Sequence, residues 1–524
     1  MNRTKIGLLT SGIAIASALV LGVLMLVRIR VILDSYGTDL NAIMQVAVQL
    51  SAYLVLLESG MSAAYQYRMY GRIHEKDEVA VLRLYRGLSI NMRQIAVRMI
   101  VVFAAVALLY AGLVRGDSLP YLDASLVLLV MGVRFIAPFL LTLPQRTLLA
   151  TYERKYIADI VQTSTDVAII VLEIVIAFTL HPPLYVLLLI ALLGTVVTVP
   201  IYNRMVSRYL KVKLDKAAQA EPDMEPKGMT KDIVVHQVSG LVFSNTDNVL
   251  LSIFHSLNSV TIYSAFNTLM NFPIQLQNRV IVGLRASLAM KITGGDRNSY
   301  AVYNEMLTFA MFCSALIAPL FIVYANPFAK LWIGPSYMLG SLDIILLAAI
   351  IVHRMIMPVV YAARDSRGLY KETKNSTIMQ AAANLAISLA LIGPLGITGV
   401  LIGTVASTFF ILQPFNFIAV YRKVFETGLL IYKQLAALAL HVACAVLACR
   451  FLCDRLLREI GTDSWWTLAV TAATSGAMVL VLAAAAFWLF SASFRAFAAR
   501  VLRTVMPARL RGRRSAGAER VPGG

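Results

Sequence analysis

The sequence predicts an all-α polytopic membrane protein with about fourteen transmembrane helices. Composition is the first reason, because 59% of the 524 residues are hydrophobic, 14% are charged and the mean hydropathy is +0.74. The second reason is a succession of apolar runs of about 20 residues, the length that a helix needs to cross the bilayer core. Lipid offers no partners to backbone groups, and these runs are too long for barrel strands, so the spans are helices.

The apolar runs form two sets of six and a final pair. They lie near 8–33, 40–63, 94–114, 122–143, 157–180, 183–203, 232–254, 259–279, 302–325, 342–362, 376–396, 397–420, 434–453 and 466–490. A polar stretch that contains Pro222 and Pro226 separates the two sets and is typical of a linker. The predicted parts are a six-helix lobe at 1–206, a cytoplasmic linker at 207–231, a six-helix lobe at 232–424, accessory helices within 425–490 and a basic cytoplasmic tail at 491–524.

A pattern shared by the fourth and tenth spans indicates that the two lobes are a duplication. Arg134 precedes Pro138 by the same interval as Arg354 precedes Pro358, and a basic turn with a tyrosine follows in each case. Parallel repeats are related by a pseudo-two-fold axis along the membrane normal, with the substrate site between them.

The net charge of +19 is explained by membrane orientation. Most Lys and Arg residues fall in the termini and the even-numbered connections, and such residues are enriched in cytoplasmic loops. Both termini are therefore predicted to be cytoplasmic, and nucleic-acid binding is not favoured. In the tail, an apolar stripe that includes Phe494 and Phe497 predicts a short helix on the inner membrane surface.

Arginines inside or just beyond the spans are the first candidates for function. A charge in mid-bilayer is costly, so such a residue usually faces a cavity or the bundle interior. Guanidinium groups bind phosphate with matched donors, which predicts a phosphate or diphosphate head group as the cargo. For Arg28, near the outer end of its span, a side chain that reaches the interface is the alternative. The candidate set is Arg28, Arg134, Arg146, Arg279, Arg285 and Arg354.

Amides and carboxylates complete the inventory. The polar face of the eighth span predicts a lined cavity. In the fifth span Asp159, Asp166 and Glu173 recur every seven residues and share one helix face, where they pair with arginines or bind cations; pairing is the favoured hypothesis. Asp247, in the apolar seventh span, is expected either to pair with Arg28 at an equivalent depth or to carry a coupling ion. The polar-face residues are Asn267, Asn271, Gln275 and Asn278, and the candidate coupling or salt-bridge acids are Glu58, Asp166 and Asp247.

Neither a metal site nor a catalytic site is predicted. The four cysteines lie in or beside spans without a surrounding set of His or carboxylate ligands, and they show no disulfide framework. No pattern combines a nucleophile, a base and an oxyanion site, so the chain is not expected to be an enzyme. An oligosaccharide polymerase or ligase would need a large outer loop, whereas the long loop of this chain is predicted to be cytoplasmic.

Three stretches resemble the O-antigen flippases of the Wzx type, within the multidrug/oligosaccharidyl-lipid/polysaccharide (MOP) exporter superfamily. They are RIRVILDSYGTDLNAIMQ at 28–45, LLESGMSAAYQYRMYG at 56–71 and NTDNVLLSIFHSLNSVTIYSAFNTL at 245–269. The chain departs from the family at Asp34-Ser35, where Leu-Gly is usual, and in having more than twelve spans. A lipid II type flippase and a cation-coupled multidrug antiporter of the same superfamily therefore stay open.

The resemblance implies two lobes around a cavity that opens alternately to each side of the bacterial inner membrane. Its implied substrate is undecaprenyl-diphosphate bearing an oligosaccharide, for O-antigen, lipopolysaccharide or exopolysaccharide synthesis. It implies Arg134, Arg279 and Arg285 as the principal lumen cations and Arg28, Arg146 and Arg354 as further ones, and it implies Glu58 and Asp247 as acidic partners. No cofactor is implied, proton or sodium coupling stays open, and a polysaccharide polymerase and a chain-length regulator are the expected protein partners.

Overall fold

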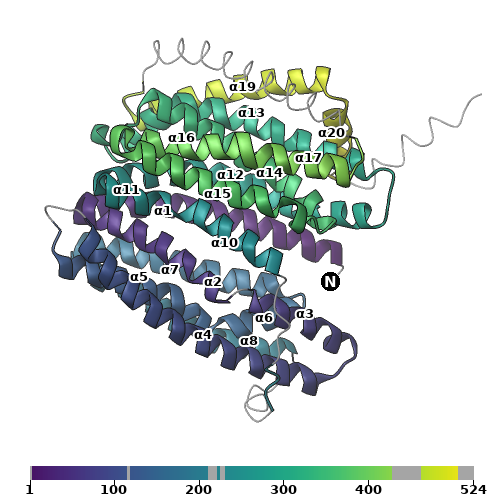
Figure 1. Ribbon diagram of the computed structural model, residues 1–524, viewed down its shortest axis with the longest axis horizontal. Helices are drawn as coiled ribbons and strands as arrows, with labels where there is room; N and C mark the ends of the chain where they lie inside the picture. The colour runs from purple at the N-terminus through teal and green to yellow at the C-terminus, as the bar shows by residue number, and fades with distance from the viewer. Residues whose placement is uncertain are drawn as a thin grey trace, which may run out of the picture. The chain divides into compact units, whose positions relative to one another are not determined.

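The structure, a computed structural model, describes residues 3–58, 60–114, 119–210, 221–224, 231–427 and 462–505. Every regular element in these ranges is a helix (Figure 1). Ten segments of the described chain are long and apolar enough to cross a membrane. The predicted fold class, a helical polytopic membrane protein, is confirmed. The thirteenth predicted span at 434–453 lies outside the described residues.

The helices of the first half follow the predicted spans, and additional shorter helices lie between them in the sequence. Their bounds are α1 Arg3–Tyr53, α2 Val55–Glu58, α3 Met61–His74, α4 Glu78–Leu113, α5 Tyr121–Leu141, α6 Leu143–Thr151, α7 Lys155–Thr179 and α8 Leu184–Leu210.

Gly37 replaces the turn that was expected between the first two spans. Helix α1 runs through both spans and changes direction at this residue, whose φ is 80° and ψ is 179°. Only glycine adopts this region of backbone space readily, because it has no Cβ. A single residue therefore accomplishes the change of direction.

The second half contains two breaks that the hydrophobic pattern does not show. The seventh predicted span is divided at Thr246, and a π-helical turn at Thr408–Leu412 interrupts the twelfth. The bounds are α10 Lys231–Asn245, α11 Asp247–Phe254, α12 Leu257–Thr293, α13 Ser299–Trp332, α14 Ser341–Ser366, α15 Tyr370–Leu395, α16 Ile397–Ser407, α17 Gln413–Lys423, α19 Trp465–Phe490 and α20 Ala492–Val505.

The chain forms two compact units, each assembled from separate stretches of sequence. Unit 1 comprises Met1–Arg279, Trp332–Leu347 and Tyr370–Leu412, and unit 2 comprises Val280–Leu331, Ala348–Leu369 and Gln413–Gly524. Such units group helices by packing and not by repeat, so the predicted lobes at 1–206 and 232–424 stay a prediction.

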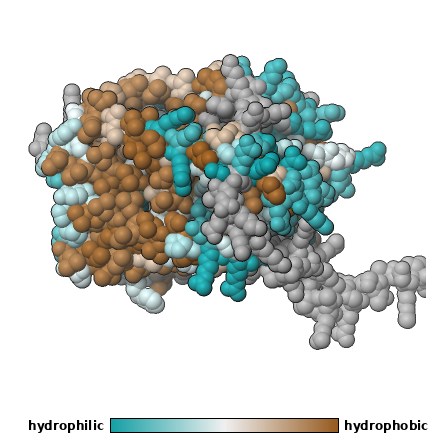
Figure 2. Space-filling view, turned by 90° about the horizontal axis from the view of Figure 1, so that it is seen from below, coloured by the Kyte–Doolittle hydropathy of each residue, from teal (hydrophilic) through white to brown (hydrophobic). Residues whose placement is uncertain are grey.

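Large hydrophobic side chains are exposed along many helices, as expected for surfaces that face lipid. Val101, Leu109 and Phe178 are 65%, 72% and 74% exposed. Figure 2 shows a broad area of one face on which hydrophobic residues predominate. An exposed apolar surface of this extent is stable in hydrocarbon and not in water.

The C-terminal helices of unit 2 pack on α13 through aromatic and hydroxyl groups. The Tyr324 hydroxyl lies 2.9 Å from the Thr471 carbonyl oxygen and 2.6 Å from Ser475 Oγ on α19. The predicted tail helix is present as α20, but Phe494 and Phe497 contact Phe312 and Phe309 of α13. Two aromatic residues of its apolar stripe therefore pack on α13, and the predicted position on the inner membrane surface stays a prediction.

Candidate functional site

A buried charge cluster joins three helices of unit 1. Arg28 of α1 places Nε 2.6 Å from one carboxylate oxygen of Glu173 on α7, and Arg134 of α5 places Nη1 3.0 Å from the other. The side chains of Arg28 and Glu173 are 7% and 1% exposed, and that of Arg134 is 27% exposed. Two guanidinium groups therefore share one carboxylate, which binds α1, α5 and α7 together.

The pairing predicted for the acidic stripe of the fifth span is confirmed at Glu173. The proposed pairing of Arg28 with Asp247 is wrong, because Arg28 donates to Glu173 and to Met44 Sδ. Asp247 accepts instead from the Tyr263 hydroxyl of α12. The similar membrane depth expected for Arg28 and Asp247 did not bring their side chains together, because each contacts a different neighbouring helix.

Arg134 and Asp166 face the same small polar cavity, of about 160 Å³. Asp166 Oδ1 accepts a hydrogen bond of 2.8 Å from Gln162, one turn earlier on α7. The remaining polar lining consists of Thr142, Thr165, Thr195 and Thr198. The structure thus brings together one predicted lumen cation and one predicted acid, next to the Glu173 cluster.

The amide-rich stretch around Asp247 is a helix junction. Helix α10 ends at Asn245 and α11 begins at Asp247. The Asn248 N–H donates to Gln49 Oε1 of α1 at 3.0 Å, and its side-chain amide donates to Ser264 Oγ of α12 at 2.9 Å. Backbone groups released by a break need such partners inside a membrane. A carboxylate in the first turn of α11 is also favoured by the helix dipole.

Glu58 has backbone partners. Its carboxylate accepts from the Ser62 N–H at 2.6 Å and from the Gly60 N–H at 3.0 Å, at the start of α3. In the described chain no arginine contacts it. This carboxylate therefore caps a short helix, a role for which the sequence contains no separate signal.

The other predicted arginines differ in their surroundings. Arg146 on α6 is half-buried and Arg279 on α12 is exposed, and neither has a hydrogen-bond or ion-pair partner among the residues that the structure describes. In unit 2, Arg285 lies 3.6 Å from Asp365, and Arg354 is half-buried on α14. The predicted polar face of the eighth span lies on α12, where Asn271 donates to Asn267 at 3.1 Å, Gln275 is exposed and Asn278 is half-buried.

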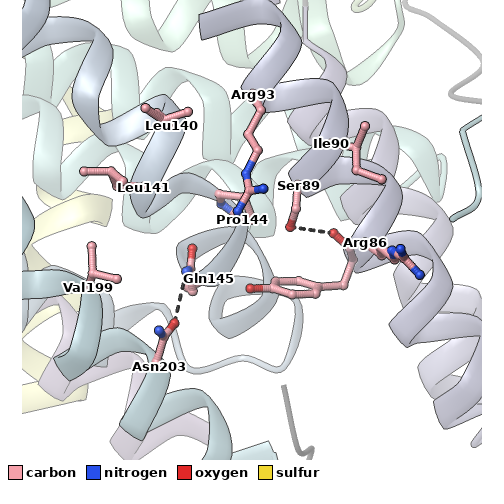
Figure 3. Close-up of a pocket in the computed structure, with 11 residues that line it drawn as sticks. Arg86, Ser89, Ile90, Arg93, Leu140, Leu141, Pro144, Gln145, Val199 and Asn203 are labelled. Atoms are coloured by element: carbon pink, nitrogen blue, oxygen red, sulfur yellow. Dashed lines mark hydrogen bonds between the residues drawn. The ribbon is translucent and has the colours of Figure 1, made fainter. Parts of the chain in front are cut away.

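A larger cavity of about 470 Å³ was not predicted (Figure 3). The third span was expected to begin near residue 94, but α4 begins at Glu78 and carries the basic residues of the preceding connection onto a helix face. Their spacing at 86 and 93, close to two helical turns, is the signal that could have indicated a shared face. The lining comprises Tyr85, Arg86, Ser89, Ile90 and Arg93 from α4, Leu140 and Leu141 from α5, Pro144 and Gln145 from α6, and Val199 and Asn203 from α8.

Residues 221–224 of the predicted linker are anchored on α3 and α4. Asp223 accepts two hydrogen bonds from Arg68, at 2.6 and 3.0 Å, and its carbonyl oxygen accepts from the Tyr65 hydroxyl at 3.0 Å. Burial raises the pKa of Tyr65 above its ordinary value, so this hydroxyl keeps its proton at neutral pH. A Cβ on Gly87 would lie 1.9 Å from the Asp223 carbonyl oxygen, so glycine is needed there.

Comparison with known proteins identifies the fold. No family model matches the sequence, and no curated protein matches it. Among solved structures, the inward closed conformation of the lipid II flippase MurJ aligns with a TM-score of 0.65 at 14% identity, covering 92% of this chain and 99% of the flippase.

Two multidrug resistance MATE family transporters of the MOP superfamily also align. The inward-facing structure has a TM-score of 0.58 at 14% identity and covers 82% of this chain and 99% of its own. The outward-facing structure has a TM-score of 0.51 at 15% identity and covers 84% of this chain and 97% of its own. The chain therefore has the fold of MOP-superfamily transporters, as the resemblance implied. Membership of the Wzx type stays a prediction.

Proposed function

We propose that the protein is a flippase that moves undecaprenyl-diphosphate-linked oligosaccharide from the inner to the outer leaflet of the bacterial cytoplasmic membrane by alternating access. The pathway would be O-antigen or exopolysaccharide synthesis, with a polysaccharide polymerase and a chain-length regulator as partners. The MOP-type fold supports a transporter, and the solved structures that resemble it are transporters and flippases.

The main observation in favour of an anionic substrate is that several acids accept hydrogen bonds within the protein, whereas two arginines have no such partner among the described residues. Glu58, Glu173 and Asp247 all accept hydrogen bonds within the protein. Arg146 and Arg279 have no such partner in the described part of the chain. Guanidinium groups in or beside a membrane whose hydrogen-bond donors have no partner in the described protein suit a diphosphate, which offers several acceptor oxygens. Arg146 is near enough to Asp166 to interact with it electrostatically, so Arg279 carries most of this argument.

The physical demands of such a substrate are modest. Its lipid tail stays in the bilayer while the polar head crosses, so the protein need only shelter the diphosphate and the sugar. An inside-negative potential favours outward movement of an anion by about 2.3 kcal/mol per charge per 100 mV. Proton or sodium coupling would need a carboxylate that changes its charge, and Asp166 in its polar cavity and Asp247 are the candidates.

Two alternatives follow from specific observations. Asp166 in a threonine-lined cavity of unit 1 suits a cation-coupled multidrug antiporter, and two of the similar structures are multidrug resistance MATE family transporters. The greater share of this chain that aligns with the lipid II flippase, 92% against 82% and 84%, favours a flippase over that antiporter. A lipid II type cargo is distinguished from an O-antigen type cargo by complementation.

The deciding experiment is analysis of lipid-linked sugars in a strain that lacks the protein. We expect undecaprenyl-linked repeat units to accumulate on the cytoplasmic side and surface polysaccharide to be lost.

Arg279→Ala should fail to restore the polysaccharide although it inserts normally, because this exposed side chain has no described partner to lose. Arg208→Ala, an exposed arginine at the end of α8, is the control and should restore it. Normal polysaccharide in the deletion strain, or rescue of a lipid II flippase depletion, would overturn the proposal.

A further inference from the structure

The unpredicted cavity between α4, α5, α6 and α8 has the chemistry of an anion site. Arg86 and Arg93 line it, and no carboxylate is among the lining residues that the structure describes. Its volume of about 470 Å³ lies within the range of small-molecule sites. We propose that this cavity binds the phosphate of an anionic glycerophospholipid from the inner leaflet, as a site separate from the path of the transported cargo.

Arg93 is the residue that points most directly to a ligand. Figure 3 shows its side chain extending from α4 toward Pro144 and Gln145 of α6. It has no hydrogen-bond or ion-pair partner within the described ranges. Its five N–H donors are therefore available to phosphate oxygens. Arg86 lies two helical turns away on the same helix, about 10 Å along its axis, and adds positive charge to the cavity lining while it also interacts within the protein.

An amide pair on the opposite wall supplies further polar groups. Gln145 Nε2 donates to Asn203 Oδ1 at 3.1 Å, and Gln145 Oε1 is buried without a hydrogen-bond partner. The two ends of a side-chain amide exchange places by a half-turn, so the pair can offer a buried acceptor or a buried donor. A head group with both phosphate and hydroxyl groups, such as phosphatidylglycerol, satisfies either arrangement and removes the cost of the unpaired atom.

The apolar part of the lining favours a lipid over free phosphate. Ile90, Leu140, Leu141 and Val199 stand beside the polar groups. Leu140 is exposed by 37%, which gives acyl chains a surface to follow. The basic connections that flank these helices predict that this end of them is cytoplasmic, where the leaflet is anionic. Basic pockets between membrane helices at that side bind anionic head groups.

The test measures lipid binding to the purified full-length protein in a neutral detergent. The probes are dioleoyl phosphatidylglycerol, dioleoylglycerol, which is the same lipid without its phosphoglycerol head group, and inorganic phosphate. Phosphatidylglycerol should raise the melting temperature of the wild-type protein and remain bound in native mass spectrometry, and the other two probes should do neither. Arg93→Ala should weaken phosphatidylglycerol binding by about tenfold or more, the loss expected for charge-assisted hydrogen bonds.

Arg208→Ala is the matched control, because it removes an exposed arginine at the end of α8 that does not line the cavity. It should bind phosphatidylglycerol as the wild type does. If Arg93→Ala is not monodisperse, Arg93→Gln, which keeps most of the side chain, decides in its place. Equal binding by the Arg93 variant and the wild type, equal losses in both arginine variants, or a response to inorganic phosphate that matches the response to lipid would each overturn the proposal. The readout does not involve transport, so its failure is distinct from failure of the proposed cargo.

Discussion

Unit 1 contains arginines in two different environments, namely those that form ion pairs with Glu173 and one, Arg93, that lines a cavity. Arg28 and Arg134 share the carboxylate of Glu173, and two of the three side chains are almost fully buried. Arg93 lines a cavity of about 470 Å³ and has no ion-pair partner among the described residues. An arginine near the membrane is therefore evidence for a ligand only when the protein does not itself neutralise it.

The largest effect is expected from Glu173→Gln. The substitution removes the carboxylate that Arg28 and Arg134 share, and breaking a buried ion pair on one side costs about 3–5 kcal/mol. The protein should lose much of its yield and melt at a clearly lower temperature in detergent. Arg28→Met should cost less, about 1.5–3 kcal/mol, because Glu173 keeps Arg134. A Glu173 variant as stable as the wild type would show that the cluster has a role other than structure.

Substitutions at Asp247 and Tyr263 measure how much stability comes from a carboxylate that accepts from a neutral hydroxyl, for comparison with Glu173, which pairs with arginines. Tyr263→Phe removes the hydroxyl that donates to Asp247 and should cost about 1.5–3 kcal/mol, measured as a lower melting temperature. Asp247→Asn keeps an acceptor for that hydroxyl and should cost less than Tyr263→Phe. If Asp247 carries a coupling ion, its Asn variant will insert and remain stable but lose ion-dependent transport. A strongly destabilised Asn variant would contradict this reading.

Gly87→Ala should release the anchored part of the linker. The added Cβ would lie 1.9 Å from the Asp223 carbonyl oxygen, so residues 221–224 cannot keep their place. We expect faster cleavage in the linker during limited proteolysis and a small change in the melting temperature, because the Arg68 to Asp223 ion pair is about one-third exposed. Gly71→Ala on α3 is the control, since a Cβ there meets nothing within 4 Å. Equal cleavage of both variants would show that the contact does not hold the linker.

Arg93→Ala should have the smallest effect on stability, within about 0.5 kcal/mol, because no internal partner loses its counter-charge. Thermal melting of lipid-free protein measures this directly. A loss as large as that of Glu173→Gln would remove the contrast between the two regions and assign Arg93 to the structural arginines.

Much of the architecture follows from the sequence, because the bilayer imposes simple rules. A run of about 20 apolar residues must be a helix, so the helical fold and most spans were predictable. The pairing of one member of the acidic stripe, Glu173, with arginines was also predictable, since a lone charge in lipid is costly. The length of α4 was missed because its first turns are polar and lie beyond the apolar run.

The sequence by itself determined that the chain spans the membrane many times, that its arginines exceed its acids, and that the 241–254 segment carries a carboxylate in an apolar setting. Hydrophobic length and charge are local properties of a chain, so they can be read without a fold. Only the tertiary structure decided which side chains become the hydrogen-bond and ion-pair partners of each charged residue. Arg28 meets Glu173 across 145 positions, and Asp247 meets a tyrosine hydroxyl 16 positions away. Helix packing sets these partners, and residue spacing along one helix carries no record of which neighbour the helix will face.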